Sequence, residues 1–198
     1  MNRRLLAVAV LVAGAALAAR AAVLIRLTDA ELVQHSSHVV AGTVTAVSTS
    51  WRDPDGDGVS QIWTTVEFRV DQVLKGPSRV GDTLTFHQLG GRIGEVEFKI
   101  AGMPKFAQGD RELLFLMANL DNPKYTPLVG FAQGRWKIRS DDKGTDFTRR
   151  DFSDSCFYRL DKNKPIEDAK PSEAEELLSD VVGRFQKEIA AQSGEELR

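Results

Sequence analysis

Apolar and polar residues alternate over much of the chain, and this pattern predicts a mostly β fold. The clearest stretch is residues 62–70, where Ile62, Val66 and Phe68 share one face while the opposite face is largely polar. The run at 39–48 is rich in β-branched residues, which favour a pleated surface. A polar Asp/Gly loop at 53–60 separates the two stretches, so we expect a long antiparallel hairpin.

Glycine-containing turns mark off further short strands. They fall at residues 83–87, 95–100, 112–117, 127–132, 135–138 and 146–149. Residues 113–117 are continuously apolar, which indicates a strand buried on both faces. Short strands at close spacing are typical of barrels and sandwiches. We predict an OB-like antiparallel barrel of about five to seven strands within residues 22–150.

Helices are expected on both sides of this β region. Thr28 and Glu31 have the spacing of a capping box, which predicts a short helix over 29–36. Ser172 and Glu175 repeat that spacing, and an apolar stripe at helical period follows them. We therefore read residues 151–198 as one segment, a polar, irregular connector followed by an amphipathic helix packed on the barrel.

The first 21 residues have the layout of a secretory signal peptide. A basic head with Arg3 and Arg4 precedes an apolar run at 5–17, and small residues follow, with cleavage expected after Ala18 or Ala21. A spanning helix needs roughly 20 apolar residues, and this run is shorter. The pattern predicts a periplasmic or secreted protein with no transmembrane segment after cleavage.

Charge and cysteine content narrow the choice of partners and of fold. The formal net charge is −2, which gives no reason to expect nucleic acid, since nucleic-acid binding usually requires a basic surface. Cys156 is the single cysteine, so an internal disulfide is excluded. A mature chain of roughly 175 residues can bury a core without such a link.

The sharpest chemical motif is the loop that contains Asp53, Asp55 and Asp57. Carboxylates at alternate positions, interleaved with glycine, match the first half of a calcium loop. The glutamate expected at the twelfth position is replaced by Thr64. Ordinary turn chemistry explains the same residues, and calcium at the three aspartates remains the single metal-site candidate.

No recognisable catalytic motif accompanies this loop. The chain contains three histidines, His35, His38 and His87, and it lacks the Gly-x-Ser-x-Gly elbow of serine hydrolases. The glycine-rich stretch at 90–94 lacks the lysine of a phosphate-binding loop. We therefore assign no catalytic residue and no further cofactor.

The order of these elements resembles a known family. A short helix precedes a valine-rich strand at 39–44, then Val-Leu-Lys-Gly at 73–76, Gly-Asp at 81–82 and Leu-Leu-Phe-Leu at 113–116. This layout resembles the netrin-like OB-fold domains, including the tissue inhibitors of metalloproteinases, and more closely a group of uncharacterised exported bacterial proteins.

The resemblance covers most of residues 27–140 and implies the fold more than the activity. The inhibitors place the amino group of a mature N-terminal cysteine on the protease zinc, whereas no cysteine precedes Cys156 here. In the bacterial proteins such domains occur near secreted zinc proteases, so the resemblance implies, by analogy, a secreted metalloprotease as a candidate partner.

We therefore expect an exported, non-catalytic binding module that acts on a protein or peptide partner, with a secreted protease as one candidate. Two alternatives stay open. One is a calcium-stabilised structural domain of the cell envelope, and the other is a hydrolase whose site carries no recognisable motif.

Overall fold

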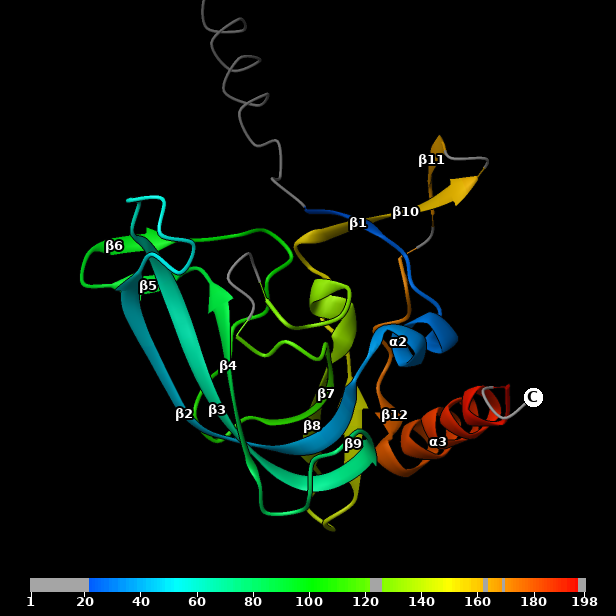
Figure 1. Ribbon diagram of the computed structural model, residues 1–198. Coiled ribbons are helices and arrows are strands. Elements are labelled where there is room, and N and C mark those ends of the chain that lie inside the picture. The colour runs from blue at the N-terminus through cyan, green and yellow to red at the C-terminus, as the bar shows by residue number, and fades with distance from the viewer. Residues whose placement is uncertain (1–21, 122–125, 162–163, 169, 196–198) are drawn as a thin grey trace, which may run out of the picture.

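The structure is a computed structural model that describes residues 22–121, 126–161, 164–168 and 170–195. The expected signal peptide lies outside these residues. Strands dominate the described chain, and two α-helices, α2 (Asp29–His35) and α3 (Leu178–Glu195), flank them (Figure 1). The predicted mostly β fold with flanking helices is confirmed. No helix among the described residues is long and apolar enough to cross a membrane.

One antiparallel sheet of seven strands forms the body of the molecule. Its order is β12 (Glu176–Leu177), β9 (Asp146–Arg149), β8 (Arg135–Ser140), β7 (Arg111–Leu116), β2 (His38–Arg52), β3 (Gln61–Lys75) and β4 (Thr83–Leu89). The order is linear, with β12 and β4 at its two edges. The described strands therefore form a curved sheet rather than the closed barrel that the sequence predicts.

The β2–β3 hairpin supplies the curvature. Its register shifts at three places, between Val39 and Val40, between Ala41 and Gly42, and between Val44 and Ala46. Such bulges bend a strand and increase its twist. Gly42 lies at one of them, and a Cβ there would approach the carbonyl oxygen of Arg69 to 2.0 Å. The hairpin predicted from the alternating pattern is confirmed.

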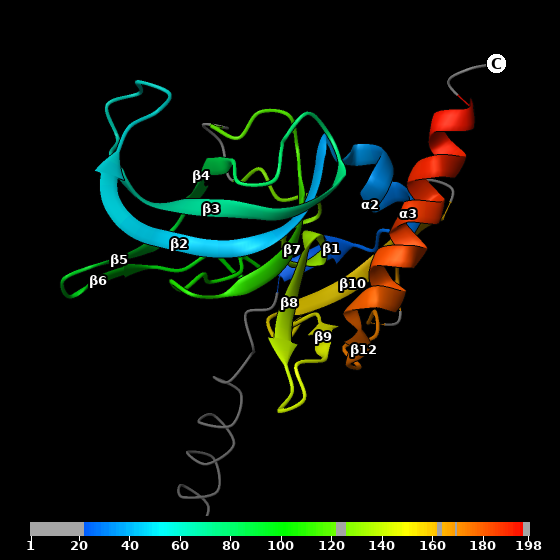
Figure 2. The same cartoon turned by 90° about the horizontal axis from the view of Figure 1, so that it is seen from below.

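The curved sheet has a core on each face, and β7 belongs to both. On the convex face, Leu113 and Phe115 pack with Trp136 and with residues of the two helices. On the concave face, Leu114 and Leu116 pack against the inner residues of β2, β3 and β4. The predicted two-sided burial of this strand is confirmed for Leu113–Leu116. Both helices lie together on the convex side (Figure 2).

Two small sheets complete the fold. Strand β10 (Ser155–Asp161) pairs in parallel with β1 (Ala22–Ile25) and antiparallel with β11 (Lys164–Glu167). The irregular connector predicted from residue 151 up to the C-terminal helix is therefore wrong for β10 and β11. The sequence pattern missed β10 because its partner β1 comes from the far end of the described chain. The second small sheet is the hairpin of β5 (Gly91–Ile93) and β6 (Val96–Phe98).

The two expected capping boxes have different outcomes. The first is present, since the amide N–H of Glu31 donates to the Thr28 hydroxyl and that of Thr28 donates to the Glu31 carboxylate. The second is wrong, because α3 begins only at Leu178. Arg139 binds Glu175, and the next two residues, Glu176 and Leu177, pair with β9 as strand β12.

The strand expected at 127–132 is absent. These residues contain one isolated bridge, between Leu116 and Leu128, and the start of the 3-10 helix η1 (Phe131–Gly134).

We predict that Phe185→Ala destabilises the protein by about 3–5 kcal/mol, the usual range for truncating a buried aromatic ring. Phe185 is fully buried, and its ring lies 4.6 Å from that of Phe115 and 5.6 Å from that of Trp136. Urea unfolding measures the effect, with Lys187→Ala on the exposed side of α3 as the control. Equal stability of the two variants would show that α3 is not part of the core.

Candidate functional site

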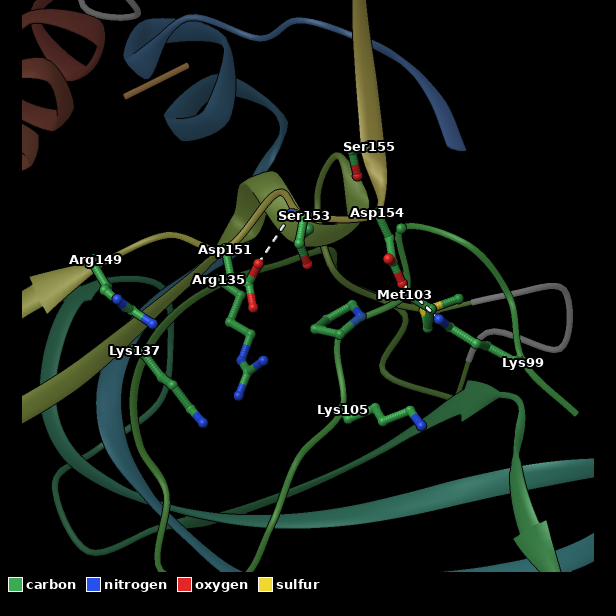
Figure 3. A pocket seen from close by; sticks show the side chains of 13 residues that line it. Lys99, Met103, Lys105, Arg135, Lys137, Arg149, Asp151, Ser153, Asp154 and Ser155 are labelled. Carbon is green, nitrogen blue, oxygen red and sulfur yellow. Dashed lines mark hydrogen bonds and ion pairs between the residues drawn. The ribbon is translucent and has the colours of Figure 1, made fainter. Parts of the chain in front are cut away.

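A cavity of about 330 Å³ lies between the segment 99–105 and the residues of β8 and β9. Three segments line it: residues 99–105, the stretch from the end of η1 into β8, and residues 149–155 (Figure 3). Five cationic and two acidic side chains are among its walls: Lys99, Lys105, Arg135, Lys137 and Arg149, with Asp151 and Asp154. The cavity is therefore a local basic site on a slightly acidic protein.

Three of these cations extend from neighbouring strands into the same space. Figure 3 shows Arg135 and Lys137 reaching from β8, with Arg149 beside them from β9. Lys137 and Arg149 are direct cross-strand partners. Like charges opposite each other destabilise a sheet. Within the part of the chain that the structure describes, Arg149 forms no ion pair, but its charge helps to lower the pKa values of Asp151 and Glu175, so these carboxylates offset part of the repulsion.

A buried ion pair holds Arg135 in place. Its Nη2 donates to Oε1 of Glu112 at 2.5 Å and lies 3.5 Å from Oδ2 of Asp110. The guanidinium also lies over the Phe106 ring, 4.8 Å from the ring centre. Glu112 has no exposed surface, and the Arg135 side chain is 11% exposed. Arg135 is thus pre-positioned, whereas Lys137, at 51% exposure and 3.7 Å from Asp110, is loosely held.

Burial raises the pKa of Glu112 to about 7, although the nearby Arg135 acts in the opposite direction. A carboxyl group at this depth loses its hydration, and one guanidinium compensates for only part of that loss. Its second oxygen, Oε2, has no hydrogen-bond partner among the described residues. The Glu112–Arg135 pair lies on the concave face, between the apolar core that contains Leu114 and the charged cavity that Arg135 lines.

We predict that the unfolding free energy falls between about pH 4.5 and pH 7 by on the order of 2 kcal/mol from Glu112 alone. The native state keeps this proton up to about pH 7, whereas the unfolded chain loses it near 4.5, so the native state binds more protons in that window. Urea unfolding across this pH range measures the slope.

Glu112→Gln is the control for this slope, because it keeps the shape of the protonated carboxyl and does not titrate. His38 and His87, whose pKa values burial lowers, act in the opposite direction but equally in both proteins. Parallel pH profiles for wild type and Glu112→Gln would contradict the assignment.

The segment 99–105 forms the opposite wall and is tied down at several points. The side-chain amide of Gln88 in β4 donates to the carbonyl oxygen of Pro104 at 2.8 Å. Lys99 pairs with Asp154 at 2.8 Å, and Lys105 pairs with Glu97 at 3.0 Å. These contacts fix the segment between β4, which supplies Gln88, and the cavity wall formed by β8.

The aspartate loop predicted to bind calcium lies elsewhere, between β2 and β3. One oxygen from each of Asp53, Asp55 and Asp57 lies within 4.8 Å of the others. The Asp53 carboxylate also accepts the backbone N–H groups of Gly56, Asp57 and Gly58 at 2.9–3.2 Å. The loop conformation is thus explained by aspartate–backbone hydrogen bonds, and calcium binding stays a prediction.

We predict that Asp53→Ala destabilises the protein by about 1 kcal/mol, because three amides lose their acceptor. Asp55→Ala is the matched control, since the Asp55 carboxylate accepts no hydrogen bond within the described chain. Thermal melting with added calcium tests the metal prediction on the same proteins. A rise in melting temperature for wild type that disappears in Asp55→Ala supports a site, and an unchanged wild-type melting temperature contradicts it.

Other candidate side chains from the sequence lie apart from the cavity. His87 contacts the Thr65 hydroxyl at 2.9 Å and one carboxylate, Asp121, at 3.4 Å. Trp63 and Trp136 are buried in the cores, and Trp51 is 53% exposed.

The sequence analysis did not predict that the residues lining this cavity form a site. The one usable signal was Glu112, a charged residue inside β7 directly before the apolar run at 113–117. A buried charge of this kind requires a partner.

Comparison with protein-family models, with curated proteins and with solved structures yields no match. The resemblance to netrin-like domains therefore depends on the sequence pattern alone and stays a prediction. The residues that line the cavity are therefore the basis for the proposed function.

Proposed function

We propose that the protein is an exported, non-catalytic binding module that holds an acidic segment of a protein or peptide partner in this cavity. The observation that carries the proposal is the group of Arg135, Lys137 and Arg149, which converge on one space although two of them repel each other across the sheet. Asp110, Asp151 and Glu175 offset this repulsion only in part, and a local rule broken without full compensation is a common sign of a functional site. An anionic partner would relieve the repulsion.

A carboxylate-bearing segment suits these groups best. Hydrogen bonds between Arg or Lys and carboxylates are charge-assisted and are about twice as strong as neutral ones. Lys105 and Lys137 are 74% and 51% exposed, so a ligand between them stays in contact with solvent. Small-molecule pockets usually bury 70–90% of their ligand. The exposure of the walls therefore favours a segment of a larger partner.

The other two candidate functions have weaker support. A hydrolase would gain from His87 and two carboxylates in one cleft, but among the described residues His87 pairs with one carboxylate, that of Asp121, outside the cavity. A calcium-stabilised structural role is favoured by the convergence of the three aspartates and is compatible with binding at the cavity. Export and a secreted metalloprotease as partner are further parts of the proposal, supported by the leader pattern and by the resemblance respectively.

We predict that the double variant Lys137→Gln/Arg149→Gln binds acidic peptides at least about tenfold more weakly than wild type, since each lost charge-assisted contact contributes roughly 1 kcal/mol. Removing the like-charge pair should also stabilise the fold by about 0.2–1 kcal/mol. Fluorescence anisotropy with a labelled Glu-rich peptide measures binding, and urea unfolding measures stability.

Lys143→Gln is the matched control, because Lys143 is exposed in the turn of the same β8–β9 hairpin and does not line the cavity. It should lose little affinity. Equal losses in control and double variant would indicate non-specific attraction to basic protein. Absence of acidic-peptide binding by wild type would contradict the proposed function itself.

A further inference from the structure

A second cavity, of about 190 Å³, lies on the other side of the segment 99–105. Four residues line both cavities, namely Lys99, Met103, Pro104 and Lys105. The two cavities are therefore neighbours separated by one short stretch of chain. That stretch is held by the Gln88–Pro104 hydrogen bond, so the division between the cavities is a fixed feature of the fold.

The second cavity differs from the first in its chemistry. Apolar side chains supply much of its wall: Val47, Leu89, Phe98, Ile100, Met103 and Phe106. Phe98, in β6, is 37% exposed at this site. Strand register places the exposed Trp51 on the same face of β2 as the lining residues Val47 and Thr49. Apolar surface thus continues outward from the cavity.

Size and charge together indicate what fits the pair of cavities. Sites for whole small molecules usually measure about 300–1,000 Å³, so a cavity of about 190 Å³ suits one side chain of a larger ligand. The neighbouring cavity is cationic and takes a carboxylate. The two cavities therefore form an apolar part and a basic part on either side of Met103 and Pro104.

We propose that the partner segment is a peptide in which a bulky apolar residue lies close to an acidic residue, with the apolar side chain in the second cavity and the carboxylate at Arg135, Lys137 and Arg149. This inference rests on the proposed function and adds the sequence class of the partner. An extended chain advances roughly 3.3 Å per residue, so the two residues must be near neighbours to reach both cavities.

The test compares peptides that carry an acidic pair and differ in one position, Phe or Ser, placed one, two or three residues away. Binding to the full exported chain is measured by fluorescence anisotropy. At the best spacing, the Phe peptide should bind about tenfold more tightly than the Ser peptide, as expected for burial of one aromatic side chain. Phe98→Ser should remove most of that preference and leave the affinity for the Ser peptide unchanged.

Val96→Ser is the matched control. Val96 is 50% exposed on the same short strand as Phe98 but does not line the cavity. It should keep the preference for Phe. Both side chains are exposed, so both variants should fold, and circular dichroism confirms it.

Two failures are distinguishable. Acidic peptides that bind through Lys137 and Arg149 with no preference for Phe at any spacing would overturn this inference and leave the proposed function standing. No binding of any acidic peptide would overturn both. Binding of anionic lipid vesicles in place of peptides would also overturn both, because the occupant would then be a lipid surface.

Discussion

Strand β7 is buried on both faces, and the layout of the molecule depends on this constraint. Leu113 and Phe115 need cover on one side, which the two helices supply. Leu114 and Leu116 need cover on the other, which the curved β2–β3 hairpin and β4 supply. A seven-stranded sheet that curls around one core without closing leaves a gap, and the segment ending at Phe106 packs into it. The two cavities lie on either side of that segment.

The charged side chains at the gap follow from the same geometry. The concave face of β7 and β8 passes from leucines to the Glu112–Arg135 pair and then to open cavity, so the buried pair lies where the apolar core ends. A buried pair with one unpartnered oxygen contributes little net stability, but it fixes the orientation of Arg135. Lys137 and Arg149 then add positive charge that Asp110, Asp151 and Glu175 offset only in part. Under the proposed function, this charge lowers the local stability of the sheet and attracts an anionic group of the partner.

The sequence predicted correctly those features that depend on residues close together in the chain. The Thr28–Glu31 capping box, the alternation over 62–70 and the two-sided burial of Leu113–Leu116 are confirmed. The incorrect predictions concern features that depend on contacts between residues far apart in the chain. Strand β10 depends on β1, and α3 starts late because Glu175 binds Arg139 and the residues after it pair with β9. The basic cavity was missed for the same reason, since Arg135, Lys137 and Arg149 become neighbours of Lys99 and Lys105 only in the folded chain.

The most direct measurement is backbone amide NMR of the protein titrated with an unlabelled peptide that combines an acidic pair with a nearby phenylalanine. Shifts concentrated at residues 99–105, on β8 and β9 and on β6 are the predicted result, because these segments line the two cavities. Shifts confined to the convex helical face or to the aspartate loop between β2 and β3 would contradict a binding site at the open edge of the sheet.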